Sequence, residues 1–274
     1  MKKKLKPKWK NWFLLFLLIF FLIVLFISSI NIIKWAIDAR RTKKQIEKID
    51  EMVEIVEEES EEPQIVEPPA EVPKENPYWD YIKYNLISVD FNELKMKNND
   101  TKGWIQVSGT NINYPFVQAN DNKFYLEHSF NKAYNKAGWV FLDYRNNVDY
   151  LSKNTIIYAH GRLDTTMFGS LKNILNSGWL NDTSNYVVRL STEKENSLWQ
   201  VFSVYHIPTT SDYIQVDFLD GEHFVSWANL LTTRSAYNFN TSVGEGDHIL
   251  TLSTCYNDNE KVVLHAKLIK KGTR

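Results

Sequence analysis

The sequence predicts a mainly β protein: a closed β-barrel of about eight strands decorated by helices and preceded by one transmembrane helix. Three observations predict this class. Near the N-terminus, Trp12 to Ile30 reads WFLLFLLIFFLIVLFISSI, nineteen residues without a charge. Residues 61–77 then hold five of the eight prolines of the chain. Beyond them, short runs of β-branched and aromatic residues alternate with Gly, Asn, Asp and Pro, which is typical of a barrel or sandwich.

The apolar segment has the length of a membrane span. At about 1.5 Å per residue, nineteen helical residues cover roughly the 30 Å of a bilayer's hydrocarbon core. A cleaved signal peptide has a shorter apolar stretch, of about 7–15 residues, followed by an A-x-A-like site, whereas SSINIIKW follows here. We therefore expect an uncleaved anchor over residues 12–33 after a basic tail of residues 1–11.

Basic residues flank both ends of this anchor. Six of the first ten residues are lysines, and the positive-inside rule then places the N-terminus in the cytoplasm. The asymmetry is shallow, because further basic residues follow the span: Lys34, Arg40, Arg41, Lys43 and Lys44. The lysines of the N-terminal tail form the densest basic cluster and the one nearest to the span. We therefore expect a single-pass protein of the cell membrane whose folded domain is extracellular.

Residues 34–77 are expected to connect the anchor to the folded domain. Over residues 35–60, apolar residues recur at spacings of three and four, which indicates a juxtamembrane helix or a short coiled coil: Ile46, Ile49, Val53 and Val56. The proline-rich residues 61–77 cannot continue a helix and predict an extended spacer. The folded domain is then expected over residues 78–274.

Elements of the folded domain follow from local pattern. Tyr78–Leu94 indicates one or two short amphipathic helices, with Asp90 as a candidate N-cap. Eight strand-like runs follow: GWIQVSG, INYPFVQ, GWVFLDY, NTIIYAHG, NYVVRLS, LWQVFSVYHI, HILTLSTC and KVVLHAKLI. Helical patterns interrupt them at Met167–Asn176 and at Gly221–Thr233, where the apolar stripe is Phe224, Trp227, Leu230 and Leu231.

Composition excludes several classes of function. A net charge of −1 provides no whole-chain case for nucleic-acid binding. The single cysteine, Cys255, excludes an intramolecular disulfide and a multi-thiolate metal site. No His/Asp/Glu cluster has the spacing of metal ligands, so we expect neither a metal nor another cofactor. The cysteine is then either a small buried side chain or a reactive thiol.

Cys255 ends the apolar run ILTLSTC and precedes a polar loop. By alternation, Leu250 and Leu252 share one face of this strand, and Thr251, Ser253 and Cys255 share the other. A nucleophilic thiol needs a proton partner. Of the six histidines, His265 lies inside VVLHAKL and is expected to be structural, whereas His160 follows the strand TIIYA and precedes a glycine turn. A Cys/His pair alone is a weak signal, because sequence does not show distance.

Longer motifs add a family resemblance. TLSTC, which ends at Cys255, is similar to the TLxTC motif of sortases, and YAHG with His160 resembles the family's histidine strand. DTTMFGSL after the histidine, together with NDTKGWIQVSGTNINYPFVQANDNKFYLEHSF and GWVFLDYRN before it, resembles class B members. The similarity runs from about Phe91 to Ile269. The chain is thereby identified as a member of the class B sortase family.

The resemblance implies an eight-stranded sortase barrel, with N-terminal helices and a helix before the penultimate strands, and a surface transpeptidase of Gram-positive bacteria. Cys255 would attack the Thr–X bond of an NPxTN-like C-terminal sorting signal and form a thioacyl enzyme. His160 would protonate the departing amine and then deprotonate the incoming one. The expected partners are surface proteins that carry this signal and an amine of a peptidoglycan cross-bridge or lipid-linked precursor.

The sequence departs from the family where a third catalytic group is expected. Lys261 stands where sortases have an arginine, and Asn257 rather than an acid stands two residues after the cysteine. Lysine keeps the charge but loses the bidentate fork. Three interpretations stay open: Lys261 substitutes for the arginine, a residue such as Arg234 enters the site, or the enzyme is weakened.

The resemblance also implies a set of substrate-binding residues: Asn122, Leu126, Thr209, Tyr213, Ile214, Ser253 and Thr254. For Tyr213 and Ile214 the alternative is ordinary loop packing. Two other functions stay open, a membrane-tethered cysteine peptidase or amidase that mainly hydrolyses its substrate, and a non-catalytic binding module.

Overall fold

The computed structural model describes residues 9–58, 64–65, 77–148, 150–255 and 259–274. The chain divides into two compact units, Met1–Thr42 and Lys43–Arg274, and each is described by itself. The folded unit that contains the barrel thus begins at Lys43, whereas the sequence pattern indicates a boundary near Tyr78.

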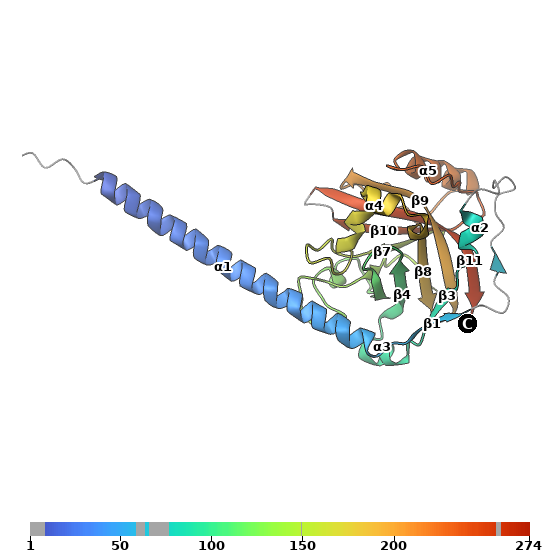
Figure 1. Cartoon of the computed structure of the whole chain (residues 1–274), viewed down its shortest axis with the longest axis horizontal. Helices are drawn as coiled ribbons and strands as arrows, with labels where there is room; N and C mark the ends of the chain where they lie inside the picture. The colour runs from blue at the N-terminus through green and yellow to red at the C-terminus, as the bar shows by residue number, and fades with distance from the viewer. Residues whose placement is uncertain (1–8, 59–63, 66–76, 149, 256–258) are drawn as a thin grey trace, which may run out of the picture. The chain divides into compact units, whose positions relative to one another are not determined.

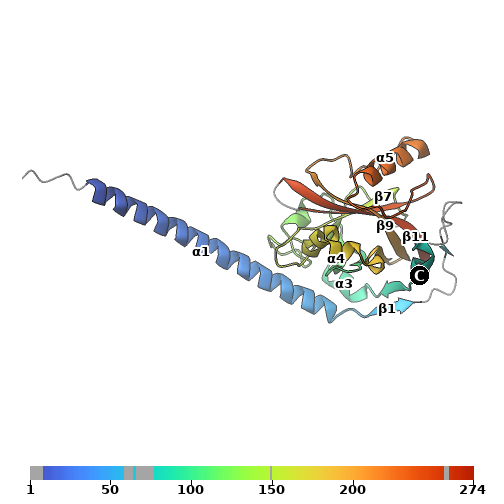
Figure 2. The same cartoon turned by 45° about the horizontal axis from the view of Figure 1, so that its top comes forward.

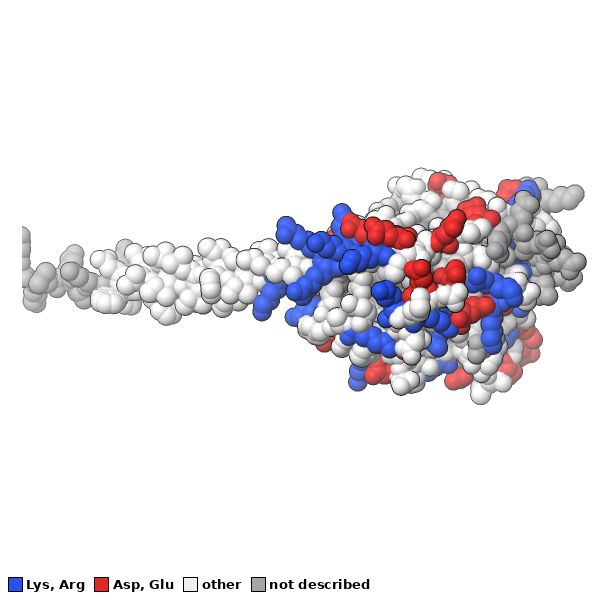
Figure 3. Space-filling view, turned by 90° about the horizontal axis from the view of Figure 1, so that it is seen from below, with Lys and Arg blue, Asp and Glu red and all other residues white. Residues whose placement is uncertain are grey.

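The first helix, α1 (Trp9–Asp50), carries the apolar segment. Among the described residues it is the one helix long and apolar enough to cross a membrane, with a mean hydropathy of 3.2 in its most apolar window. Its large apolar side chains from Trp12 to Ile27 are exposed in this unit, except that of Leu17, which is half-buried, and such a surface suits a membrane-spanning helix. Figure 3 shows the long uncharged surface of α1 followed by clustered basic side chains.

The helix predicted over residues 35–60 ends earlier, at Asp50. Residues Ile55–Glu58 instead form a strand, β1, that pairs antiparallel with β3 (Leu86–Val89). The prediction of a continuous helix was therefore wrong beyond Asp50. All four residues of β3 are buried, and the open edge of a buried strand needs hydrogen-bond partners. β1 supplies those partners, and the hydrogen bonds that it forms outweigh the weak preference of this segment for a helix.

The proline-rich segment was expected to be only a spacer, but its residues Gln64–Ile65 form strand β2. This strand pairs with the end of β11 (Glu260–Thr273), with Ile65 opposite Lys270. Residues 61–63 and 66–76 of the predicted spacer lie outside the described part of the chain.

The predicted barrel is confirmed. Figures 1 and 2 show the strands curved around one another, with α5 on their outside. Strands β4 to β11 lie in the order β10-β7-β6-β5-β4-β8-β9-β11, and pairing of β10 with β11 closes the sheet. Neighbours pair antiparallel except β10–β7 and β5–β6. The remaining bounds are β4 Thr101–Val107, β5 Asn113–Val117, β6 Phe141–Leu142, β7 Asn154–Tyr158, β8 Val187–Thr192, β9 Glu195–Pro208 and β10 Ile249–Cys255.

Short helices lie between the strands. The two helices expected over Tyr78–Leu94 are α2 (Tyr78–Tyr81) and α3 (Asn92–Lys97), with β3 between them. The predicted N-cap was wrong by one residue, because the N-cap of α3 is Phe91. The carboxylate of Asp90 still accepts a hydrogen bond from the backbone N–H of Asn92, at 2.9 Å. The other short helices are η1 Phe124–Leu126, η2 Gly169–Leu175, α4 Ser177–Leu180 and η3 Thr183–Asn185.

Helix α5 has the predicted bounds, Gly221–Thr233. Asp220 caps it by accepting a hydrogen bond from the backbone N–H of His223, at 2.8 Å. The helix lies on the outside of the barrel beside β9 (Figure 1). Of its predicted apolar stripe, Phe224, Trp227 and Leu231 are buried, whereas Leu230 is exposed.

Two hydrophobic clusters stabilise the unit. The larger fills the barrel and includes the fully buried Trp104, Trp139 and Trp199. The smaller lies under α5 and includes Phe224 and Trp227. β10 faces both, because Leu250 and Leu252 belong to the larger cluster while Ile249 belongs to the smaller. This alternation fixes which side chains the strand presents at its end.

Candidate active site

A groove of about 290 Å³ opens at one end of the barrel. It is lined by Asn122, Leu126, Phe141, Tyr158, Ala159, His160, Thr209, Thr210, Tyr213, Ile214, Ser253, Thr254 and Lys261. All the predicted site residues except Cys255 are in this set. Residues more than a hundred positions apart in the chain are thus brought to one surface.

Strand pairing places the cysteine at the same rim. β10 runs parallel to β7 with Ser253 opposite Tyr158, so the carboxyl ends of both strands meet there. On the other side, Cys255 is directly opposite Lys261 of β11. Cα atoms of such antiparallel partners are about 4.5–5.5 Å apart. The backbone of Cys255 is described and its side chain is not.

The ring of His160 is oriented by a backbone carbonyl. Its Nε2 lies 2.7 Å from the carbonyl oxygen of Leu126. Since a carbonyl only accepts, Nε2 carries the hydrogen, and the neutral ring has its lone pair on Nδ1. The turn that follows is held by the backbone N–H of Phe168, which donates to the carbonyl of His160 at 3.1 Å. Nδ1 is therefore the basic atom of this ring and the one that can exchange a proton.

Gly138 limits the space behind this histidine. Its φ is +61°, and a Cβ there would lie 2.5 Å from the carbonyl oxygen of Tyr125, 2.8 Å from that of Leu126 and 3.0 Å from Cδ2 of His160. We expect Gly138→Ala to lower kcat at least about tenfold and to destabilise the fold by about 1–3 kcal/mol, measured by peptide cleavage and thermal unfolding.

Gly178→Ala is the matched control, because this glycine lies in α4 and an added Cβ meets nothing within 4 Å. It should leave kcat unchanged and raise stability slightly. Wild-type activity of Gly138→Ala would show that the ring position of His160 does not depend on this contact.

Of the two cations considered for the third catalytic role, the structure brings Lys261 to the groove. Arg234 instead follows α5 as its C-cap and forms an ion pair with Asp212. The hydrogen bond from Arg234 holds the pKa of the Asp212 carboxyl below its ordinary value. Arg234 thus anchors the loop that carries Tyr213 and does not line the groove.

The predicted substrate loop is held at several points. Tyr213 is buried and its hydroxyl lies 2.9 Å from Oγ of Ser253, so it both packs and lines the groove. The backbone N–H of Thr209 donates to the carbonyl of Asn259 at 2.9 Å. Oγ1 of Thr254 is buried and has no hydrogen-bond partner among the described residues.

His265 is structural, as predicted. The ring is completely buried, with Nε2 2.8 Å from the hydroxyl of Tyr205 and Nδ1 2.9 Å from Oγ1 of Thr251. Desolvation lowers the pKa of His265 to about 3. A ring that stays neutral at physiological pH and lies away from the groove does not take part in proton transfer there.

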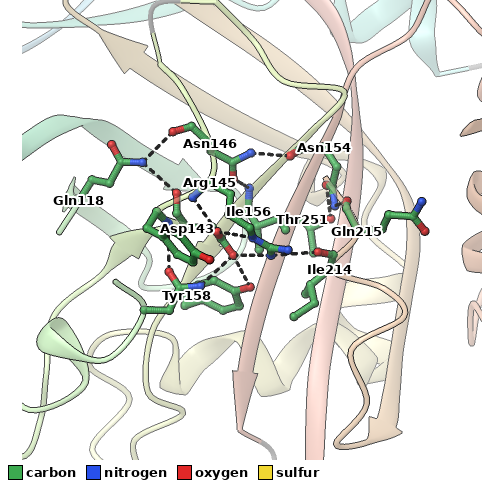
Figure 4. Close-up of polar contacts among 12 residues, drawn as sticks. Gln118, Asp143, Arg145, Asn146, Asn154, Ile156, Tyr158, Ile214, Gln215 and Thr251 are labelled. Atoms are coloured by element: carbon green, nitrogen blue, oxygen red, sulfur yellow. Dashed lines mark hydrogen bonds and ion pairs between the residues drawn. The ribbon is translucent and has the colours of Figure 1, made fainter. Parts of the chain in front are cut away.

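Sequence reasoning missed four lining residues, Phe141, Tyr158, Ala159 and Thr210. Tyr158 could have been found, because it lies two residues before His160 and alternation favours the same face. It also missed the polar network beneath the groove, centred on Asp143 and Arg145 (Figure 4). No local sequence signal distinguishes that aspartate from a surface one.

The sortase domain model matches residues 105–269, which include every predicted site residue. The chain belongs to the sortase family. The match covers more than half of the chain and all eight barrel strands in whole or in part.

Individual relatives place this sortase in the B type. Sortase B of Listeria monocytogenes is 34% identical over 188 residues, which cover 66% of this chain and 75% of that protein. A Staphylococcus aureus sortase B–substrate complex has a TM-score of 0.61 at 33% identity and covers 66% and 84% of the two chains. A sortase B complexed with triglycine has a TM-score of 0.62 at 33% identity, with coverage of 66% and 85%. This sortase is a cysteine transpeptidase.

Proposed function

We propose that this sortase cleaves an NPxTN-like sorting signal after its threonine and joins the surface protein to a peptidoglycan amine. The observation that carries the proposal is the meeting of the β7 and β10 ends. It brings His160, Ser253 and Thr254 to one groove, and pairing of β10 with β11 adds Lys261 opposite Cys255, the residue after Thr254. The groove has room for a short extended peptide, and its lining offers both apolar and polar contacts.

In the first half-reaction, Nδ1 of His160 takes the proton of the Cys255 thiol, and the resulting thiolate attacks the threonine carbonyl carbon of the signal. The tetrahedral intermediate collapses as the C–N bond to the next residue breaks, and the departing amine takes a proton from Nδ1 of His160. A thioacyl enzyme remains. In the second half-reaction, an acceptor amine loses a proton to the same nitrogen and attacks the thioester carbon, and the thiolate leaves.

Lys261 is the residue we assign to the oxyanion. It lines the groove and lies opposite Cys255 across the β10–β11 pair. A positive charge at this place stabilises the negative charge that develops on the carbonyl oxygen. Lysine acts as a point charge and lacks the fixed geometry of an arginine fork.

For the acceptor we propose an amine of a peptidoglycan cross-bridge or its lipid-linked precursor. The support is that a similar sortase B has been crystallised with triglycine.

Because α1 is long and apolar enough to span a bilayer, we further propose a single-pass protein with a cytoplasmic N-terminus and an extracellular catalytic domain. In that arrangement the groove is on the side of the membrane where peptidoglycan is assembled.

Transfer and hydrolysis are separated by one experiment. The full-length protein in detergent is incubated with a fluorescent peptide that contains NPxTN, with and without triglycine. We expect a new amide product, identified by its mass, that joins the peptide's threonine to triglycine. A product consisting of the free threonine acid alone, at any triglycine concentration, would instead support the hydrolytic function.

A further inference from the structure

The carboxylate of Asp143 lies directly after β6 and is completely buried. Its Oδ1 accepts from Nε of Arg145 at 2.8 Å, and its Oδ2 accepts from Nη2 of the same residue at 2.7 Å. The backbone N–H of Arg145 adds a further bond to Oδ1 at 2.9 Å. Burial opposes ionisation, but these bonds, with those from Asn122 and Tyr158, hold the pKa of Asp143 below its ordinary value. The group is thus an ionised carboxylate with several donors around it.

Two of those donors line the groove. Nδ2 of Asn122 and the hydroxyl of Tyr158 each lie 2.9 Å from Oδ2 of Asp143. Arg145 reaches a third groove residue, because its Nη2 also donates to the carbonyl of Ile214 at 3.1 Å (Figure 4). One buried carboxylate is therefore linked, directly or through Arg145, to three residues that line the groove: Asn122, Tyr158 and Ile214.

The orientation of the Asn122 amide follows from this chemistry. An ionised carboxylate only accepts, so the amide must turn its NH₂ group toward Asp143. On the other side, the backbone N–H of Tyr144 donates to Oδ1 of Asn122 at 3.0 Å. Both contacts exclude the flipped amide. The second hydrogen on Nδ2 forms no hydrogen bond with another described residue and can be donated to a ligand in the groove.

We propose that Asp143 is a positioning residue that makes Asn122 a hydrogen-bond donor to the bound peptide. The proposal rests on the proposed function, in which this groove takes the sorting signal. It has a consequence for specificity: the part of the peptide that meets Asn122 must be an acceptor, namely a backbone or side-chain carbonyl oxygen. Asp143 itself does not line the groove and acts only through its neighbours.

The test is a double-mutant cycle on peptide binding. The affinity of the NPxTN peptide is measured by fluorescence anisotropy on the full-length protein with Cys255→Ala, so that no thioacyl enzyme forms. We expect Asp143→Asn and Asn122→Ala each to raise Kd about tenfold, which corresponds to the loss of roughly one hydrogen bond to the peptide. Because Asp143 acts through Asn122, the double variant should be within about twofold of the weaker single variant. Wild-type affinity for Asp143→Asn, or independent losses that multiply to about a hundredfold, would overturn the proposal.

Asp247→Asn is the matched control for general destabilisation. Asp247 is also buried, accepts from the backbone N–H of Gly244 at 2.7 Å and lies 3.4 Å from Nζ of Lys267, but it does not line the groove. It should lower Tm and leave the peptide Kd unchanged. A Kd that rises as much as for Asp143→Asn would mean that loss of any buried aspartate has this effect, and would overturn the proposal.

If Asp143→Asn does not fold, Asn122→Asp tests the same point, since it keeps the shape and replaces the donor by an acceptor. It should weaken binding at least as much as Asn122→Ala, and wild-type affinity would overturn the donor assignment. Failure of the proposed function is recognised separately, because wild-type protein would then neither bind nor cleave the NPxTN peptide, whereas failure of the Asp143 proposal alone leaves wild-type binding and transfer intact.

Discussion

Cys255→Ala is expected to abolish cleavage and transfer of the sorting peptide, by at least about 10⁴-fold in kcat/KM. The chain has no other cysteine, so no second thiol can form the thioacyl intermediate. Cys255 ends β10, and the strand's pairing with β11 depends on backbone groups, so the fold should persist. The measurement is mass spectrometry of the protein with the peptide: the wild type should carry the added acyl mass and the variant should not.

The control for this prediction is peptide binding, which Cys255→Ala should retain because the groove lining is otherwise unchanged. In cells that carry this variant, surface proteins with the sorting signal should no longer be anchored and should be released into the medium. Anchoring that continues at the wild-type level in a strain with Cys255→Ala would favour the non-catalytic binding module.

Lys261→Ala is expected to lower kcat by about 10²–10³. The residue lines the groove and lies opposite the nucleophile's position on the neighbouring strand, so its charge is the one best placed for the oxyanion. Lys261→Arg keeps that charge and adds a planar fork, and should therefore retain or raise kcat. Single-turnover measurements of thioacyl formation report this step without acceptor binding.

Arg234→Gln separates the two cations. Arg234 forms an ion pair with Asp212 at the substrate loop, so its loss should change KM more than kcat. A fall in kcat as large as for Lys261→Ala would return Arg234 to the third catalytic role. Equal activity of wild type, Lys261→Ala and Lys261→Arg would remove Lys261 from the mechanism.

Elements whose pattern is local could be predicted from the sequence. The apolar run that begins at Trp12 predicts a helix because, in an apolar environment, the backbone N–H and C=O groups must be paired within the segment. The strand-like runs and α5 follow from side-chain periodicity, which depends on neighbours within a few positions. The predicted bounds of α5, Gly221–Thr233, agree with the structure because Asp220 provides a local cap.

Elements that depend on distant partners could not be predicted in this way. β1 and β2 are short and lie in segments with helical or proline-rich patterns, and they form because β3 and β11 offer open edges. The Asp143 network has the same origin. Arg145 is a local partner, but Tyr158 reaches the carboxylate because β7 pairs with β6, and Asn122 because β5, which precedes it, pairs with β6.

The sequence by itself determined the long apolar N-terminal helix, the strands of the barrel, the family resemblance and the residues to be tested, because these depend on composition, period and motif. Only the tertiary structure decided which residues meet. It placed His160, Lys261 and the predicted substrate-binding residues around one groove, gave Arg234 a partner in Asp212, and buried Asp143 beside Asn122. The physical reason is that strand order and register, which bring residues far apart in the chain together, arise from non-local backbone pairing and core packing.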